Sequence, residues 1–427
     1  MRSSADVAAA AAAATATGGA LRLRVVSYNV LSSHLAQPSH FSSLPPEHLK
    51  ASNRLPVILQ KLQAEIDQQQ HRNTNASARS VIFCLQEVSY DWAGEFHTFF
   101  SNRGFHMVTG LYGKKFNGYM GVCLAWPTAS LETLAVDISR LSDQREKCVE
   151  QSGGDCGWPV PPEPNEWERS SLWFQARTKI WNPLASHVQE SIMALVQQPI
   201  FRYILGTADA TTEPPTDHWA VAQNRMNVML TATLREKESG RSFLVSTYHM
   251  PCAYYAPMIM TIHVDLAVRH VQNLAAAAAA TTTTTTNDHQ PKEKLPYILA
   301  GDFNIKPVDS TYRLITTGQM DRTDPCYPTP KYGYEWMPSM REPMQSAYAM
   351  LAHEPDFTNY ARVGDLENEC FIDTLDYIWL SPSSWKVDSI AELPQRQDAK
   401  GPFPNLDVNE ASDHVLIAAD LTLPERV

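Results

Sequence analysis

Apolar and polar residues follow one another along the chain in patterns that predict strands and helices in turn. "LRLRVVSYNVL" (residues 21–31) alternates and then becomes apolar, which predicts a strand ending at Asn29. "RLPVILQKLQAEI" (54–66) spaces its apolar residues three and four apart, as an amphipathic helix does. "SVIFCLQEV" (80–88) is a continuous apolar run, expected of a strand covered on both faces. Strands separated by helical patterns are typical of an α/β protein.

Polar side chains stand where these apolar runs begin or end. Four later segments repeat the design, and they are "SFLVSTYHM" (242–250), "LPYILAGDFN" (295–304), "TLDYIWL" (374–380) and "SDHVLIAADLTL" (412–423). Folds of this class place their sites at strand ends, so we expect these polar groups to converge. The set consists of Asn29, Glu87, His249, Asp302, Asn304, Asp376, Asp413 and His414.

The chemistry of this set favours a metal-assisted reaction at phosphate. Carboxylate and amide oxygens suit a hard cation, Mg²⁺ or Mn²⁺, better than a structural zinc ion. Histidines beside such oxygens can hydrogen-bond phosphate or exchange protons near neutral pH. The set therefore predicts hydrolysis of a phosphate ester. The alternatives are turn residues for the two asparagines and ordinary buried histidines for His249 and His414.

Composition narrows the class of protein. The 427 residues are 44% hydrophobic and include 10 Trp, which excludes a wholly disordered chain. A formal charge of -11 argues against a broad basic surface that holds nucleic acid through its phosphates alone. The 7 Cys form no CxxC pair, which favours a reduced intracellular protein. No apolar run approaches the roughly 20 residues that span a bilayer.

Three stretches interrupt the pattern. Residues 1–20 are Ala-rich, and we expect a disordered low-complexity leader rather than a targeting peptide. Residues from about 128 to 222 are rich in proline and aromatic residues, and we interpret them as an insertion that is either a lid or a packed subdomain. An Ala/Thr run, about 275–294, predicts a flexible surface loop after a helical pattern at 258–274.

The motifs resemble those of the endonuclease/exonuclease/phosphatase superfamily. "SYNVL", "LQEV", "GDFN", "LDYI" and "SDH" occur in the family's order. Further stretches, among them "QSAYAML", "FTNY" and "FPNLDVNEASDHVLIAADL", are similar to the deadenylase and nocturnin branch. The resemblance spans residues 21–423 apart from the insertion and the Ala/Thr loop. It implies a DNase I-like four-layer sandwich, two stacked β-sheets flanked by helices, for a domain of residues 21–427.

The resemblance also implies a role for each polar residue. Glu87 would hold the principal Mg²⁺ ion, with Asn29 beside it and Asp413 close by. Asp302 would orient or deprotonate the attacking water, and Asn304 would bind a phosphate oxygen. His249 and His414 would stabilise charge on the phosphate, and Asp376 would orient His414. Arg225 and Asn227, which precede a predicted strand, would contact substrate.

The predicted activity is that of a Mg²⁺-dependent phosphoesterase, a 3′-to-5′ exoribonuclease that acts on RNA tails. One alternative is a phosphatase of small nucleotides, phosphoinositides or lipid headgroups. Another is a catalytically dead binding module, which the complete set of acids argues against, since clustered carboxylates repel one another without a cation. Tyr254 and Tyr255 could stack on a base or fill a core edge. We expect a cytoplasmic monomer, and the sequence has no leucine-rich docking repeats.

Overall fold

A computed structural model describes most of the chain and divides it into two compact units. The described residues are 19–72, 79–145, 157–162, 217–282, 294–364 and 369–425. The larger unit contains residues 1–157, 218–329 and 336–427, and the smaller contains residues 158–217 and 330–335. In the smaller unit, Lys331 and Tyr334 form an isolated β-bridge, and the Lys331 ammonium is paired with Asp217.

The larger unit is built on two six-stranded sheets. The first sheet has the order β13-β14-β1-β2-β4-β3. Its strands are β1 (Leu21–Asn29), β2 (Ser80–Val88), β3 (Phe105–Leu111), β4 (Gly121–Pro127), β13 (Lys386–Ile390) and β14 (Ile417–Leu423). The second has the order β5-β6-β7-β8-β12-β9. Its strands are β5 (Leu131–Arg140), β6 (Val228–Glu236), β7 (Ser242–His249), β8 (Tyr297–Asp302), β9 (Gln345–Ser346) and β12 (Asp376–Leu380).

Each sheet contains one parallel pair of strands among antiparallel neighbours. β1 is parallel to β2, and β7 is parallel to β8. A parallel pair needs a crossover connection, and a long helix supplies it in both cases. These helices are α3 (Ala51–Arg72) and α11 (Pro257–Thr282). A separate two-stranded ribbon pairs β10 (Asn359–Ala361) with β11 (Phe371–Asp373).

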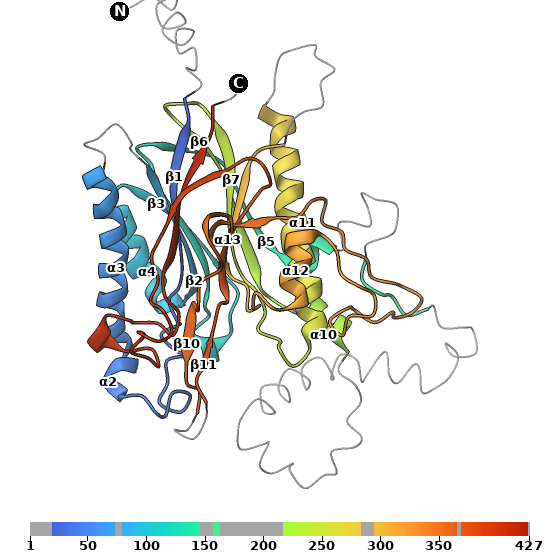
Figure 1. The fold of residues 1–427 in the computed structure, drawn as a ribbon, viewed down its shortest axis with the longest axis horizontal. Coiled ribbons are helices and arrows are strands. Elements are labelled where there is room, and N and C mark those ends of the chain that lie inside the picture. The colour runs from blue at the N-terminus through green and yellow to red at the C-terminus, as the bar shows by residue number, and fades with distance from the viewer. Residues whose placement is uncertain are drawn as a thin grey trace, which may run out of the picture. The chain divides into compact units, whose positions relative to one another are not determined.

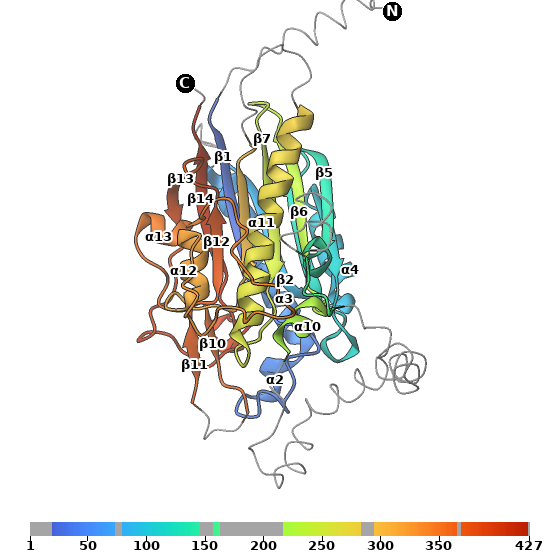
Figure 2. The same cartoon turned by 90° about the vertical axis from the view of Figure 1, so that its right-hand side faces the viewer.

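Helices cover the outer faces of the two sheets (Figures 1 and 2). α3 and α4 (Tyr90–Ser101) pack on the first sheet, and Ile58, Leu62, Phe96 and Phe100 lie in one buried cluster with its strands. α11 lies along the second sheet. The remaining short helical segments are α2 (Pro46–Leu49), α10 (His218–Gln223), α12 (Ser310–Thr317), α13 (Ala347–Leu351) and the 3₁₀ turns Lys115–Asn117 and Leu406–Val408. The predicted α/β fold of two stacked, helix-flanked sheets is confirmed.

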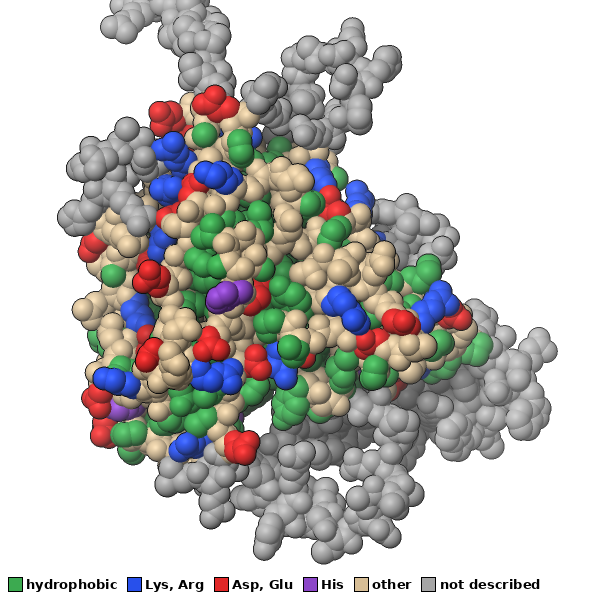
Figure 3. Space-filling model, in the orientation of Figure 1, with side chains coloured by type: hydrophobic (Ala, Val, Ile, Leu, Met, Phe, Trp, Pro, Cys, Tyr) green, Lys and Arg blue, Asp and Glu red, His purple; other side chains and the backbone are tan. Residues whose placement is uncertain are grey.

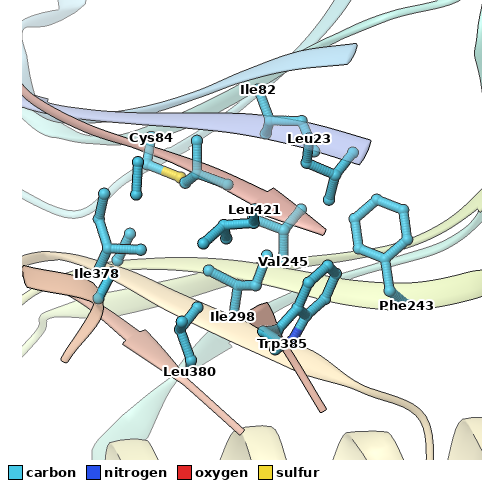
Figure 4. Close-up of a cluster of buried hydrophobic side chains, with 14 of the residues drawn as sticks. Leu23, Ile82, Cys84, Phe243, Val245, Ile298, Ile378, Leu380, Trp385 and Leu421 are labelled. Atoms are coloured by element: carbon cyan, nitrogen blue, oxygen red, sulfur yellow. The ribbon is translucent and has the colours of Figure 1, made fainter. Parts of the chain in front are cut away.

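The inner faces of the two sheets share one apolar core. Figure 4 shows Leu23 and Ile82 of the first sheet facing Val245, Ile298 and Ile378 of the second. Every residue of β2 and β8 is buried, because these central strands are covered on both faces. The continuous apolar runs seen in the sequence have this cause.

The structure differs from expectation at the Ala/Thr run and at the insertion, and it does not describe most of the leader at residues 1–20. α11 continues through the alanine run to Thr282, so the predicted loop at 275–294 begins too early. Alanine has the highest helix propensity, which favours extension of the preceding helix. The stretch assigned to the insertion, about 128–222, takes in β5 and α10 at its two ends, and both belong to the larger unit. Residues 1–18, 146–156, 163–216 and 283–293 lie outside the described residues.

Candidate active site

The carboxyl ends of the two parallel pairs bring the predicted residues together. Asn29 is the last residue of β1, His249 the last of β7 and Asp302 the last of β8. β12 runs antiparallel to β8, so its first residue, Asp376, lies opposite Asp302. His249 and Asp302 are also register partners, which places three candidate side chains in one row across the second sheet. The convergence predicted from polar strand ends follows from this topology.

Asn29 links the two sheets. Its side-chain amide donates to Glu87 Oε1 at 3.2 Å and to Asp302 Oδ2 at 2.9 Å. Its own oxygen accepts from the backbone N–H of Leu31 at 3.0 Å, which fixes the orientation of the amide. Asn29 is 1% exposed, so these hydrogen bonds are shielded from water. The first and second sheets therefore share one polar cluster.

A backbone irregularity directs Glu87 into this cluster. The residue has φ 60°, and the β2–β4 register shifts between Leu85 and Val88. A non-glycine residue in the left-handed region is strained by roughly 1–3 kcal/mol, and such strain concentrates at functional sites. The other carboxylate oxygen, Oε2, accepts from the backbone N–H of Ser32 at 3.0 Å.

Asp302 and Asn304 form a tight polar turn after β8. The backbone N–H of Asn304 donates to Asp302 Oδ1 at 2.9 Å, and Asn304 has φ 51°. The Asn304 side-chain amide donates to the Met250 carbonyl at 2.9 Å. Gly301 just before them is required by close packing, because a Cβ there would lie 1.9 Å from the Tyr248 carbonyl oxygen. The turn geometry that the sequence offered for Asn304 is present, while its predicted contact with a phosphate oxygen stays a prediction.

His414 and Asp376 form a buried pair. His414 Nδ1 lies 2.7 Å from Asp376 Oδ2, and His414 Nε2 lies 3.6 Å from Asp302 Oδ2. Burial acts to lower the pKa of His414, but the Asp376, Asp302 and Asp413 carboxylates hold this pKa well above its usual range. Burial raises the pKa of Asp376, and the His414 charge opposes that rise. The three acids around His414 therefore favour the protonated form of its ring.

His249 faces the cluster from the opposite side. Its Nε2 atom lies 3.6 Å from Asp302 Oδ2 and 3.9 Å from Glu87 Oε1. Asp302 therefore lies between the Nε2 atoms of His249 and His414. Two nitrogen donors directed toward one region can hydrogen-bond the oxygens of a phosphate group.

Asp413, Arg225 and Asn227 occupy less central positions. Asp413 Oδ2 accepts from the Asn359 amide at 3.3 Å. Arg225 donates to the Tyr255 hydroxyl at 3.0 Å, and Asn227 donates to the His249 carbonyl at 2.8 Å. The Asn227 amide therefore bonds the chain itself, while its predicted substrate contact stays a prediction.

The two tyrosines left open by the sequence are at the surface. Tyr254 is 81% exposed and Tyr255 is 58% exposed, so neither fills a core edge. Both belong to the segment that follows His249. A stacking role with a base stays a prediction.

Sequence reasoning did not single out three residues that hold the site together. The Thr358 hydroxyl donates to Asp376 Oδ2 at 2.6 Å. Arg54, fully buried, donates to the carbonyls of Leu31 and Ala411 at 2.5 and 2.6 Å and so connects the two loops that follow β1 and precede β14. Tyr112 contacts His249. Only Thr358 had a signal, since it lies in the "FTNY" motif, whereas nothing local distinguishes Arg54 from a surface arginine of an amphipathic helix.

The cluster fits a divalent cation. Ligand atoms of Asp302, Asp376 and His414 all lie within 4.8 Å of one another, and Glu87 adds a further carboxylate that shares the Asn29 amide with Asp302. His414 Nδ1 is already bonded to Asp376, so we consider oxygens of Glu87 and Asp302 the better donors for a hard ion. Asp376 Oδ1 is buried and has no hydrogen-bond partner among the described residues. A cation would balance three acids that lie close together.

Comparison with known proteins agrees with this geometry. The model of the Endonuclease/Exonuclease/phosphatase family matches residues 26–414. A CCR4-Not complex 3'-5'-exoribonuclease subunit Ccr4 of Aspergillus fumigatus is 22% identical over 414 residues, which are 94% of this chain and 51% of that protein. Carbon catabolite repressor protein 4 homolog 4 of Arabidopsis thaliana is 25% identical over 408 residues, covering 94% of this chain and 78% of the relative.

A solved structure shares the fold. ANGEL2, described as a 2',3'-cyclic phosphatase, superimposes with a TM-score of 0.57 at 17% identity and covers 95% of this chain and 96% of its own. This chain spans about half the length of the fungal relatives that it matches. Because the family model matches most of the chain, the chain belongs to the Endonuclease/Exonuclease/phosphatase family.

Proposed function

We propose that this protein is a metal-dependent phosphodiesterase that removes nucleotides from the 3′ end of RNA. The observation that supports it best is the row of His249, Asp302 and Asp376, closed by His414 into one buried cluster. The similarity to Ccr4 exoribonuclease subunits supports RNA as the substrate. A cytoplasmic location and a monomeric state stay predictions. Among the described residues, every helix is too short or too polar to cross a bilayer.

The residues divide the reaction among them. Asp302 orients and deprotonates a water molecule, whose oxygen attacks the terminal phosphorus. The bond between phosphorus and the 3′ oxygen of the preceding nucleotide breaks, that oxygen takes up a proton from solvent to become the new 3′ hydroxyl, and a nucleoside 5′-monophosphate is released. His249 and His414 donate N–H groups to the phosphate oxygens as negative charge grows there. Asp376 orients His414, and Asn304 binds another phosphate oxygen.

A divalent ion completes the site. Glu87 would hold Mg²⁺, or Mn²⁺ in its place, with Asn29 beside it, and the ion would neutralise charge on the phosphate. The buried acids need such a partner, since they repel one another in a medium of low dielectric constant.

The test is degradation of a 5′-labelled RNA that ends in a run of adenosines. We expect a Mg²⁺-dependent ladder that shortens from the 3′ end, lost with EDTA and in the Asp302→Ala variant. An intact RNA under conditions where the protein is folded and binds Mg²⁺ would contradict the proposal.

A second candidate is a phosphatase of a small nucleotide or a terminal phosphate. Lys and Arg side chains on the face in Figure 3 are interspersed with Asp and Glu, so that face offers no continuous basic track for a long polyanion. ANGEL2, which shares the fold, is a 2',3'-cyclic phosphatase by its description. RNA that ends in a 2',3'-cyclic phosphate, small dinucleotides and phosphoinositides are the substrates to assay beside the adenosine tail.

A further inference from the structure

We infer that Tyr112 is a positioning residue that orients the imidazole of His249 in the proposed phosphodiesterase. The Tyr112 hydroxyl lies 3.1 Å from His249 Nδ1, the ring nitrogen on the side away from Asp302 and Glu87. The inference rests on the proposed function for its kinetic consequence. The orientation of the His249 ring by Tyr112 does not depend on that function.

The backbone places Tyr112 firmly. The residue follows β3, and its N–H donates to the Met120 carbonyl at 3.1 Å, which extends the β3–β4 hairpin by one hydrogen bond. Its ring packs on the core between the sheets. Because the backbone and the ring of Tyr112 are both held, its side chain loses little further conformational freedom when the hydroxyl bonds a histidine.

The direction of the hydrogen bond follows from the surroundings. Burial raises the pKa of Tyr112 well above its usual range, and the Glu87 and Asp302 carboxylates raise it further. The phenol therefore keeps its proton and can donate it to His249 Nδ1. A neutral imidazole that accepts at Nδ1 carries its own proton on Nε2, the atom directed toward Asp302. If the ring is doubly protonated, the tyrosine oxygen accepts instead, and the ring orientation is the same.

Asn227 fixes the backbone of the same residue. Its side-chain amide donates to the His249 carbonyl at 2.8 Å. β3, β6 and β7 thus each contribute to the placement of one imidazole: Tyr112 just beyond β3 holds the ring, and Asn227 just before β6 holds the carbonyl. Supporting residues of this kind typically change activity by about 10- to 100-fold when they are removed.

The two histidines of the site are oriented by different chemistry. A carboxylate, Asp376, bonds His414, whereas a neutral phenol bonds His249. A phenol orients a ring without adding negative charge to a cluster that already contains three acids. His249 thereby serves as a hydrogen-bond donor at the phosphate.

The chain contains a matched control. Tyr248, the residue before His249, also places its hydroxyl on a histidine Nδ1 atom, 3.0 Å from that of His263. Successive side chains of a strand point to opposite faces, so this second pair lies away from the site. Tyr248→Phe removes the same type of hydrogen bond as Tyr112→Phe, from a neighbouring part of the molecule.

The experiment compares the two variants in the full-length protein with Mg²⁺ and oligoadenylate RNA. We expect Tyr112→Phe to lower kcat by about 10- to 100-fold with little change in KM, and Tyr248→Phe to leave kcat unchanged. Nitrogen-15 NMR of the histidine rings gives a readout that does not need activity. The His249 Nδ1 resonance should shift in Tyr112→Phe and stay in place in Tyr248→Phe.

Two results would overturn the inference. One is a Tyr112→Phe variant whose kcat stays within about twofold of wild type while Asp302→Ala is inactive. The other is a His249 ring resonance that Tyr112→Phe leaves unmoved. If the wild-type protein does not cleave RNA, the proposed function fails while the NMR comparison still decides the role of Tyr112.

Discussion

Two buried histidines, His414 and His263, have opposite electrostatic surroundings. His414 lies among carboxylates, and their charges hold its pKa well above the usual range. His263, in α11, lies between the Tyr248 hydroxyl and the Ala222 carbonyl, at 3.0 Å from each. Burial lowers the pKa of His263 to about 4, so this ring is neutral. Burial therefore keeps the His263 ring neutral, whereas the acids around His414 favour its charged form.

The comparison of His263 with His414 shows where the fold places charged groups at a cost in electrostatic free energy. The neutral His263 has both ring nitrogens satisfied, as a buried polar group normally must. The site contains several acids, the His414 ring whose protonated form they favour, and the Asp376 Oδ1 atom, which has no hydrogen-bond partner among the described residues. Such an arrangement is stable only where the fold holds it and a ligand relieves it.

The largest expected effect comes from removing the charge of Asp376. In Asp376→Asn, His414 loses the carboxylate that orients it and raises its pKa, and we expect kcat to fall by up to about 10⁴-fold, as in another acid–histidine pair. The free energy of unfolding should fall by about 3–5 kcal/mol, because removing one partner of a buried ion pair leaves the other group without its partner. Steady-state kinetics and urea unfolding measure the two quantities. An unchanged free energy of unfolding would mean that the Asp376–His414 pair adds nothing to the stability of the fold.

The lowered pKa of His263 predicts how the free energy of unfolding changes with pH. Its pKa is about 4 in the folded state and near 6.5 when unfolded, so the unfolded chain binds the proton first. Stability is therefore complete above about pH 6.5 and falls as the pH is lowered toward 4, by about 3 kcal/mol in all. Chemical unfolding at a series of pH values measures this slope. Over the same pH range, the free energy of unfolding of the His263→Gln variant should fall by about 3 kcal/mol less than that of the wild type. An equal fall in the two proteins would refute the lowered pKa of His263.

Stabilisation by a bound metal ion should depend on the acid cluster and not on the surroundings of His263. Saturating Mg²⁺ should stabilise the protein by about 2–3 kcal/mol at 100 times its dissociation constant. Glu87→Gln should abolish the shift in melting temperature if Glu87 is an oxygen ligand of the ion, as proposed. Tyr248→Phe should keep the shift, since the His263 environment contains no metal ligand among the described residues. An equal shift in Glu87→Gln would place the ion elsewhere.

The smallest effect is expected at Thr358. Its hydroxyl donates to Asp376 Oδ2 at 2.6 Å and accepts the backbone N–H groups of Leu375 and Asp376. Thr358→Val should lower the free energy of unfolding by about 1–2 kcal/mol and reduce kcat severalfold, because the acid is then held less firmly. Thr358→Ser keeps the hydroxyl and should restore most of kcat. Equal kinetics for the two variants would show that the hydroxyl has no part in orienting Asp376.

Much of the fold was predictable from local pattern. The strand ending at Asn29 and the runs that became β2, β7 and β8 were recognisable because buried strands are apolar throughout. The end of α11 was predicted too early, because low-complexity sequence was taken as loop although alanine favours helix. The strands β9, β10 and β11 are two or three residues long, too short for a periodic signal.

The site residues were recognisable for a different reason. Asp302 and Asn304 stand out because two polar groups follow a buried run, and the family motifs supply their order. Tyr112 and Arg54 were missed, since each acts through a partner more than 100 residues away in sequence or through backbone carbonyls. Neither kind of contact leaves a local signature.

The amino-acid sequence by itself determined the strands, the helices, the family and the inventory of acids and histidines, because each depends on residues close together in the chain. Only the tertiary structure decided which of those groups meet. Asn29 and Asp302 are 273 positions apart, and the stacking of two sheets brings the amide nitrogen of one within 2.9 Å of the other's carboxylate. The same packing raises the pKa of His414 and lowers that of His263 to about 4. The charge of a buried group depends on its neighbours in space, and those follow from the stacking of the two sheets.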